Sequence, residues 1–551
     1  MRKVGLFATV FSIAMLAGCG TAPNGEQIVV TGSRAGENAD MAAAPPPPPP
    51  PPSPPAPVMQ ASRTGAQRNY VPPVQVAADP GREQYAGEEV SPVKLTATEP
   101  VSTFSVDVDT GAYANSRRFL TSGQLPPRDA VRTEEMINYF RYDYAAPETT
   151  EQPFSVTADM ARTPWNAETR LLRIGLRGYD LPRDERPPAN LVFLLDVSGS
   201  MGSPDKLPLV KSALSGLAGE LGARDTVSIV VYAGAAGLVL EPTNDTRAIR
   251  RALDSLNAGG STAGGAGLKL AYNIAADNFI EGGVNRVILA TDGDFNVGVS
   301  DRDTLVEMIE NKRDSGITLT TLGFGTGNLN DAMMEQIANH GNGNYAYIDS
   351  ALEAKKVLGD EMQSTLFTIA KDVKIQVEFN PAVIGQYRLV GYENRALREE
   401  DFDNDRVDAG DIGAGHQVTA IYEVVPAGTR GWVSQRRYED TPPTTAQMLA
   451  AEAAHVKLRY KLPDGDTSRL IDFTVPSAMI ADARAPSGDF AFATAVAAFG
   501  QSMRADPLLG EFGYRDIREL ARAGIGNRRN DYWRQEFIQL VELAETMQKG
   551  G

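Results

Sequence analysis

The stretch LVFLLDVSGSM, Leu191 to Met201, decides how this chain folds. It opens with five consecutive apolar residues, which predict a strand buried on both faces, as in a parallel sheet covered by helices. The apolar run ends at Asp196, and the hydroxyls of Ser198 and Ser200 follow at alternate positions. A strand that finishes in three oxygen-bearing side chains on one turn predicts that these oxygens converge on a single point.

Short apolar runs and amphipathic helical stretches alternate across the residues that surround this stretch. The periodicity predicts strands at residues 191–195, 227–231, 287–290 and 319–322, and helices at residues 207–221, 246–256, 266–278, 303–314 and 330–339. We therefore expect the α/β fold class, with a doubly wound, mostly parallel sheet. Sheets of this kind bind ligands at the carboxyl ends of their strands, which is where Asp196 lies.

Two further loops place oxygen donors at the same edge of the predicted sheet. The glycine-rich loop Gly259–Gly265 carries Thr262 just before a helix, and Asp292 lies just past the end of a buried strand. Asp294 and Asn296 stand beside Asp292, where they would either orient water around a ligand or form the turn. The candidate ligand set is therefore Asp196, Ser198, Ser200, Thr262 and Asp292.

Carboxylate and hydroxyl oxygens are the donors that a hard divalent cation prefers. Mg²⁺ fits such a set because it keeps several of its own waters, and Mn²⁺ or Ca²⁺ binds similar donors. No His or Cys accompanies these positions, which argues against Zn²⁺ or Cu²⁺. At most two carboxylates would contact the ion, so its remaining positive charge would favour a carboxylate from another protein as a further ligand.

These three motifs resemble the metal-ion-dependent adhesion site of von Willebrand factor type A domains. The similarity covers DVSGS, the threonine of GGST and the first aspartate of TDGD, and it extends over residues 190–368 in order and spacing. It implies that Ser198 and Ser200 bind the ion through their hydroxyls, and that Asp196 and Asp292 bind it directly or through water. It also implies that Thr262 enters or leaves the coordination sphere as the domain changes affinity. The alternative is that the same residues cap helices and form turns around an empty site.

The flanking segments are similar to the YfbK-like bacterial lipoproteins, whose A domain lies between family-specific regions. The resemblance rests on TFSVDVDT (residues 103–110), RTEEMINYF (132–140) and TDGDFNVG (291–298). We expect an N-terminal region with the first strands of a β domain (93–188), the A domain (189–368), a β-sandwich-like region (369–480) and a helical C-terminal region (481–551). The apolar patterns place later strands at 373–379, 387–392, 417–425, 455–460 and 469–475, and helices at 132–142, 489–503 and 531–549. The β domain would then be interrupted by the A domain.

The N-terminus resembles a bacterial lipoprotein signal. Residues 1–18 combine Arg2 and Lys3 with a short apolar stretch, and Leu16-Ala-Gly-Cys19 is similar to a lipobox. The resemblance implies that Cys19 is lipidated and that the lipid alone anchors the protein, at the outer membrane facing the periplasm or the cell surface. The alternative is an ordinary secretory signal. Residues 19–92 include eight consecutive prolines and are expected to form a disordered tether.

The overall charge of −17 disfavours nucleic acid as a partner. No sequence pattern typical of hydrolysis or phosphoryl transfer is visible, so we expect no enzymatic activity. The expected function is a cell-envelope lipoprotein that binds a protein partner by offering its metal ion to an acidic residue. The alternatives are a structural or scaffolding protein whose ion only stabilises the fold, and an adaptor for another envelope complex.

A second acidic segment begins like a calcium-binding loop at Asp401, Asp403 and Asp405. Arg406 stands where that loop requires glycine, and Ile412 stands where it requires glutamate. We therefore expect a solvated acidic loop rather than a calcium site.

Overall fold

The computed structural model describes residues 83–261, 264–293, 295, 302–433, 451–526 and 531–550. The expectations for the signal, for Cys19 and for most of the tether fall outside the described residues. Thr262, Asp294 and Asn296 fall outside them too. Among the described residues, no helix is both long and apolar enough to cross a bilayer.

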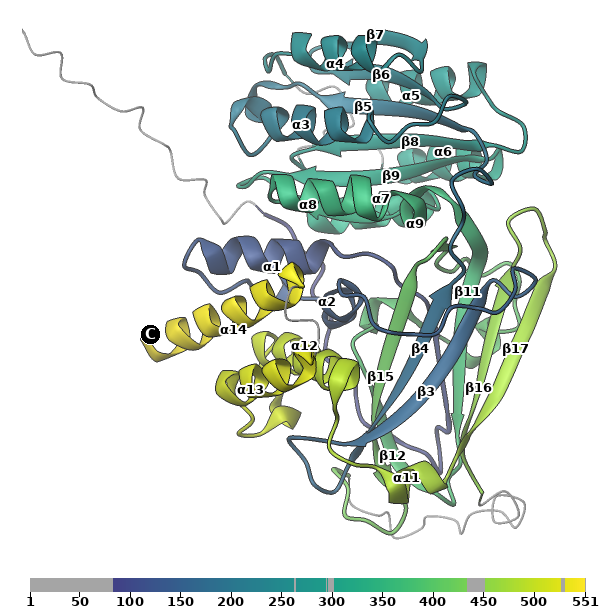
Figure 1. Cartoon of the computed structure of the whole chain (residues 1–551), viewed down its shortest axis with the longest axis vertical. Helices are drawn as coiled ribbons and strands as arrows, with labels where there is room; N and C mark the ends of the chain where they lie inside the picture. Colours follow the sequence, from purple (N-terminus) through teal and green to yellow (C-terminus); the bar gives the residue numbers. More distant parts are fainter. Residues whose placement is uncertain are drawn as a thin grey trace, which may run out of the picture. The chain divides into compact units, whose positions relative to one another are not determined.

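A six-stranded sheet forms the central α/β part of the chain, in the order β10-β9-β8-β5-β6-β7 (Figure 1). All neighbouring strands are parallel except β6 and β7. The predicted α/β fold class with a mostly parallel sheet is confirmed. The strands are β5 (Ala189–Asp196), β6 (Thr226–Tyr232), β7 (Ala236–Thr243), β8 (Val284–Thr291), β9 (Ile317–Phe324) and β10 (Tyr345–Ile348).

Helices cover both faces of this sheet, which explains why β5 is apolar at successive positions. Leu191 and Phe193 face one side, where they belong to the same buried cluster as residues of α3, α4 and α8. Val192 and Leu194 face the other side and cluster with residues of α5, α6 and α7. The helices are α3 (Leu207–Leu217), α4 (Thr246–Ser255), α5 (Gly264–Asp277), α6 (Arg302–Asp314), α7 (Asp331–His340) and α8 (Ala351–Lys355), which continues as a π-helix, η4 (Lys356–Asp360).

Two antiparallel sheets form the β domain, in the orders β1-β12-β15-β4-β3 and β13-β2-β11-β16-β17. Strand β4 precedes the α/β part in the chain, yet it pairs with β15 from beyond it, with Leu172 opposite Tyr422. The two sheets pack against each other: the ring of Tyr422 on β15 lies 5.2 Å, centre to centre, from the ring of Phe379 on β11 of the other sheet. The A domain therefore interrupts a β domain, as expected from the sequence.

The strands of these two sheets are β1 (Lys94–Leu95), β2 (Val101–Ser105), β3 (Phe154–Arg162), β4 (Arg170–Gly178), β11 (Thr368–Phe379), β12 (Ile384–Val390), β13 (Ala396–Leu397), β15 (Gln417–Pro426), β16 (Glu452–Lys461) and β17 (Ser468–Pro476). A short strand, β14 (Ile412–Gly413), pairs with the start of β11.

A helical layer combines elements from both ends of the described chain. Its core contains Tyr139 and Phe140, next to α2, together with Phe492 of α12 and Phe537 of α14. The helices of this layer are α1 (Gly111–Thr121), α2 (Thr133–Asn138), α12 (Gly488–Met503), α13 (Tyr514–Ile525) and α14 (Tyr532–Gly550). Two short helices lie outside it: α9 (Met362–Leu366) contacts β14, and α11 (Ala478–Asp482) contacts β3. Short 3-10 turns are η2 (Arg128–Ala130), η3 (Gly199–Gly202), η5 (Glu393–Arg395), η6 (Glu399–Asp401) and η7 (Pro507–Leu509).

The expected helix at 132–142 is nearly twice as long as the observed one, since α2 (Thr133–Asn138) ends at Asn138. Beyond α2, the backbone of Tyr142 forms two hydrogen bonds with the side chain of Gln417. The N–H of Tyr142 donates to Oε1 of Gln417 at 2.7 Å, and the carbonyl of Tyr142 accepts from Nε2 at 2.9 Å. A tertiary partner therefore replaces the helical hydrogen bonds there.

Candidate metal centre

The candidate ligands lie at the carboxyl edge of the α/β sheet. Asp196 is the last residue of β5, and Asp292 comes one residue after the end of β8. These two strands are parallel neighbours with Leu195 paired to Ala290, so their carboxyl ends lie side by side. The sheet therefore brings together Asp196 and Asp292, which are 96 positions apart in the sequence.

The carboxylate of Asp196 is fully buried and held from three directions. Its Oδ1 accepts a hydrogen bond from the backbone N–H of Ser198 at 2.8 Å. Its Oδ2 accepts from the hydroxyl of Thr291 at 3.1 Å and from the phenol of Tyr232 at 3.2 Å. These contacts fix the orientation of the carboxylate relative to the turn that follows β5.

Ser198 and Ser200 place their hydroxyls close together on this turn, with the two Oγ atoms 3.0 Å apart. Ser198 is buried and Ser200 is exposed, so solvent reaches the pair from the Ser200 side. The turn is also tied to the loop that leads to Thr262: the N–H of Gly199 donates to the carbonyl of Gly260 at 3.1 Å. Gly260 has φ +92°, a conformation that favours glycine.

Asp292 is fully buried and forms an ion pair that the sequence did not predict. The ammonium of Lys206 donates to Oδ2 of Asp292 at 2.8 Å and to Oδ1 of Asn328 at 3.1 Å. Lys206 directly precedes α3 and is itself buried. The sequence feature that could have suggested this ion pair is a single lysine ten positions after Asp196, at the start of an apolar helix.

The electrostatics of Asp196 differ from those of Asp292. No Lys or Arg in the described part of the chain contacts Asp196, whose hydrogen bonds come from hydroxyls and one backbone N–H. Burial raises the pKa of Asp196, and the negative charge of Asp292 acts in the same direction. A buried carboxylate without a counter-charge is costly, and a bound cation would remove that cost.

The donor set fits a small, hard cation. It consists of two carboxylates and two hydroxyls, which suits Mg²⁺ with several retained waters. Within the described residues, no three His, Cys, Asp or Glu side chains gather in a way that could hold a metal ion. The candidate centre therefore depends on its serine hydroxyls as much as on its carboxylates.

The turn after Asp292 packs tightly against the loop between β9 and α7. Gly293 has φ +94°, and a Cβ at this position would overlap the backbone of Leu329 and Asn330. Earlier in the same loop, the N–H of Gly327 donates to Oε1 of Glu83 at 2.9 Å. This close packing positions Asn328, which in turn holds Lys206.

The acidic segment after β13 is only partly solvated. Asp403 and Asp405 are exposed and pair with Arg459, as expected for a solvated loop. The expectation is wrong for Asp401, which is buried and accepts from Arg398. Farther along this segment, Asp411 is partly buried, and burial raises its pKa to about 7. Here the chain packs against β11, which a local acidic pattern does not reveal.

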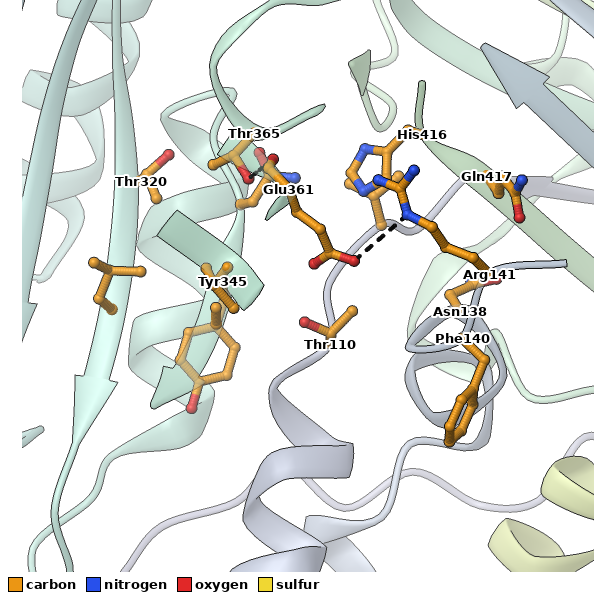
Figure 2. Close-up of a pocket in the computed structure, with 15 residues that line it drawn as sticks. Thr110, Asn138, Phe140, Arg141, Thr320, Tyr345, Glu361, Thr365, His416 and Gln417 are labelled. Carbon is orange, nitrogen blue, oxygen red and sulfur yellow. Dashed lines mark hydrogen bonds and ion pairs between the residues drawn. The ribbon is translucent and has the colours of Figure 1, made fainter. Parts of the chain in front are cut away.

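A small cavity of about 30 Å³ lies between the A domain and the β domain (Figure 2). Figure 2 shows Arg141 and Glu361 facing each other across it, with Nε and Oε1 3.9 Å apart. Burial lowers the pKa of the adjacent His416 to about 3, so its imidazole is neutral. The cavity has room for about one water molecule, which makes it a packing feature rather than a binding site.

Comparison with known proteins gives the family of this chain. Residues 364–547 match the family described as "Uncharacterized protein YfbK, C-terminal", residues 190–360 match the von Willebrand factor type A domain, and residues 79–173 match the family described as von Willebrand factor. "Uncharacterized protein YfbK" of Escherichia coli (strain K12) is 45% identical over 476 residues, which cover 85% of this chain and 82% of that protein. This chain belongs to the YfbK family.

Solved structures similar to this YfbK-family chain each cover part of it. BatB from Bacteroides thetaiotaomicron is 25% identical with a TM-score of 0.28, and the match covers 32% of this chain and 97% of BatB. A von Willebrand factor type A protein from Catenulispora acidiphila is 17% identical with a TM-score of 0.37, covering 65% of this chain and 80% of that one. The family matches and the relative from Escherichia coli confirm the predicted resemblance to YfbK with an A domain, while the lipid anchor stays a prediction.

Proposed function

We propose that this protein is a non-enzymatic binding protein of the cell envelope, whose A domain uses a divalent cation to bind an acidic residue of a partner protein. Asp196, Ser198, Ser200 and Asp292 would hold the ion, and Thr262 would join them. Mg²⁺ is the expected ion, with Mn²⁺ or Ca²⁺ as substitutes. The observation that carries this proposal is the buried Asp196 carboxylate, which lacks a basic partner in the described part of the chain and lies beside two serine hydroxyls.

Each residue has a role that its contacts support. Tyr232 and Thr291 fix Oδ2 of Asp196, so the carboxylate does not need to reorient when a cation arrives. Ser198 and Ser200 offer neutral oxygens, which bind a cation without cancelling its charge. A bound divalent ion would supply a centre of positive charge that a carboxylate can ligate. Because Ser200 is exposed, that centre would be accessible from solvent.

The proposed location follows from the N-terminal sequence. A lipid on Cys19 would hold the protein at the outer membrane, facing the periplasm or the surface, and residues 19–92 would act as the tether. The membrane would then be contacted through the lipid only. With a net charge of −17, no nucleic-acid partner is proposed.

A structural role of the ion is the second candidate. It is favoured by the position of Asp196, which joins β5 to Tyr232 at the end of β6 and to Thr291 at the end of β8. An ion there would neutralise a buried charge and stabilise the sheet edge without any partner. In that case, removing the ion would lower the melting temperature and leave partner binding unchanged.

Thermal unfolding with and without Mg²⁺ tests the metal half of the proposal. A ligand at about 100 times its Kd adds about 2.7 kcal/mol to the free energy of unfolding, so saturating Mg²⁺ should raise the melting temperature. Asp196→Asn keeps the shape of the side chain and removes its charge, and it should abolish this increase. Asp277→Asn removes an exposed charge on α5 and serves as the matched control, with the full Mg²⁺ effect expected.

Crosslinking of envelope proteins to the purified chain, in Mg²⁺ or in EDTA, tests the binding half. We expect a crosslinked partner that EDTA and Asp196→Asn both remove. Identical crosslinking profiles in Mg²⁺ and EDTA, with a normal Mg²⁺-dependent melting shift, would instead establish the structural role.

A further inference from the structure

Lys206 occupies a position at the candidate metal centre that the fold has built for it. Its ammonium lies 2.8 Å from Oδ2 of Asp292 and 3.1 Å from Oδ1 of Asn328, and the residue is only 6% exposed. Its aliphatic stem passes over Gly325, where a Cβ would overlap the lysine carbons. Gly325 has φ +71°, so the backbone there also requires glycine. The lysine is therefore fixed in place and is not a mobile surface cation.

The second partner of Lys206 is held equally firmly. Asn328 lies in the loop between β9 and α7, which Glu83 and Gln84 anchor: Glu83 accepts from the N–H of Gly327 at 2.9 Å, and the N–H of Gln84 donates to the carbonyl of Leu329 at 2.9 Å. A side-chain amide on an anchored loop keeps the ammonium beside Asp292.

The charge of Lys206 changes what the centre can bind. Two buried carboxylates alone would balance both charges of a divalent cation, so the residual positive charge expected from the sequence requires a further cationic group at the site. With Lys206 paired to Asp292, the described charged side chains of the centre (Asp196, Asp292 and Lys206) carry a single net negative charge, and a bound divalent ion keeps a net positive one. At a buried site these charges interact strongly, because the surrounding medium screens them poorly.

We propose that Lys206 is a specificity-determining residue of the metal centre, one that weakens divalent-cation binding and strengthens capture of a carboxylate by the bound ion. This inference rests on the proposed function, because it presumes that the centre binds a divalent ion. It assigns Lys206 no ligand role. Lys206 acts through Asp292 and through the net charge of the site.

The test compares Lys206→Met with the wild-type chain. Methionine keeps a long aliphatic stem over Gly325 and removes the charge. Calorimetric titration with MnCl₂ should show at least tenfold tighter Mn²⁺ binding by Lys206→Met. Acetate titrated into the Mn²⁺-saturated proteins, followed by the relaxation rate of water protons, should show at least threefold weaker acetate binding by the variant.

Two controls separate site charge from general effects. Lys211→Met removes the same charge from α3, where the Lys211 ammonium bonds the carbonyls of Asp254 and Leu256, and it should bind Mn²⁺ and acetate as the wild type does. Lys206→Arg keeps the charge and should stay within about threefold of the wild-type Mn²⁺ affinity, which provides a readout even where the methionine variant folds poorly.

The outcomes distinguish this inference from the proposed function. Mn²⁺ binding by the wild type together with equal or weaker Mn²⁺ binding by Lys206→Met overturns the role of Lys206 and leaves the metal centre standing. A gain in Mn²⁺ affinity in Lys206→Arg as large as the gain in the methionine variant does the same, because the arginine keeps the charge. Absence of Mn²⁺ binding from the wild type and from both variants overturns the metal centre itself. Detectable Mn²⁺ binding by Lys206→Met, with none by the wild type or by Lys206→Arg, supports the inference.

Discussion

Asp411 illustrates how single residues of this chain respond to pH. Burial raises its pKa to about 7, and the negative charge of Asp372 acts in the same direction. The folded state therefore binds this proton more tightly than the unfolded state, in which an aspartate has a pKa near 4. The resulting stabilisation is complete below about pH 4 and is lost as the pH rises through about 7.

Asp411→Asn should therefore gain stability relative to the wild type as the pH rises. In the wild type, the backbone N–H of Asp372 donates to Oδ1 of Asp411 at 3.2 Å. The asparagine side chain keeps an oxygen that accepts this hydrogen bond, and it does not ionise. Linkage predicts that the difference in the free energy of unfolding grows by up to about 1.4 kcal/mol per pH unit between pH 5 and pH 7. Urea denaturation at pH 5, 6, 7 and 8 measures it.

Asp405→Asn is the control for this prediction, because the pKa of Asp405 is lowered in the folded state, whereas that of Asp411 is raised. The hydrogen bond from Ser468 lowers the pKa of Asp405, and so does Arg459. The ionised Asp405 carboxylate therefore stabilises the folded state above about pH 4, and this stabilisation is lost only in more acidic solution. Between pH 5 and pH 8, the difference in the free energy of unfolding between Asp405→Asn and the wild type should be constant. A constant difference for Asp411→Asn as well would contradict the assignment of its pKa.

At the residue scale, the positions of the candidate ligands were predictable where the pattern is local. Asp196, Ser198 and Ser200 share one turn, so their convergence follows from strand-end geometry. Lys206 was missed because its partner, Asp292, is reached only through the pairing of β5 with β8. Whether the four described candidates hold an ion stays a prediction.

Arg117 connects three helical elements that are far apart in the sequence. It lies on α1 and bonds Asp349, 2.6 Å away and just before α8, Glu353 of α8 at 2.7 Å, and Glu536 of α14 at 3.0 Å. The guanidinium is nearly buried, as are its three carboxylate partners. Its removal would leave three negative charges unpaired at the junction of the A domain with the helical layer.

Arg117→Met should lower the free energy of unfolding by about 3–5 kcal/mol, the cost of breaking a buried charge pair. Arg117→Lys should recover only part of this, since an ammonium cannot reproduce the forked hydrogen bonds of a guanidinium. Arg515→Met removes an exposed pair on α13 and should cost less than about 1 kcal/mol. Chemical denaturation measures all three, and a cost below 1 kcal/mol for Arg117→Met would show that this junction does not hold the elements together.

At the element scale, buried strands and long helices were predictable, whereas the edge strand β7 and the short strand β10 were not. β7 is a partly exposed edge strand containing Pro242, and β10 has only four residues, so neither has a strong apolar pattern. α13 lies within the C-terminal region (481–551) that was expected to be helical, although its bounds were not predicted. The premature end of α2 depends on Gln417, which no local rule could supply.

At the scale of the whole molecule, the interrupted β domain was predictable from strand patterns on both sides of the A domain. The pairing that closes it, β4 against β15, was not, because antiparallel register between strands more than 200 residues apart leaves no local trace. Buried side chains of β4 (Leu172) and β11 (Ile375) belong to the same cluster as Leu191 and Phe193 of β5. The A domain and the β domain are therefore joined by a continuous apolar core.

The central claim is that Asp196, Ser198, Ser200 and Asp292 together hold one divalent cation. Anomalous scattering from a crystal of the chain grown with MnCl₂ tests it most directly, because Mn²⁺ can be located independently of the protein atoms. We expect one strong anomalous peak bonded to the hydroxyls of Ser198 and Ser200, between the two aspartates and separate from the ammonium of Lys206. A map with no peak at this sheet edge, in crystals that show Mn²⁺ bound elsewhere on the protein, would contradict the account.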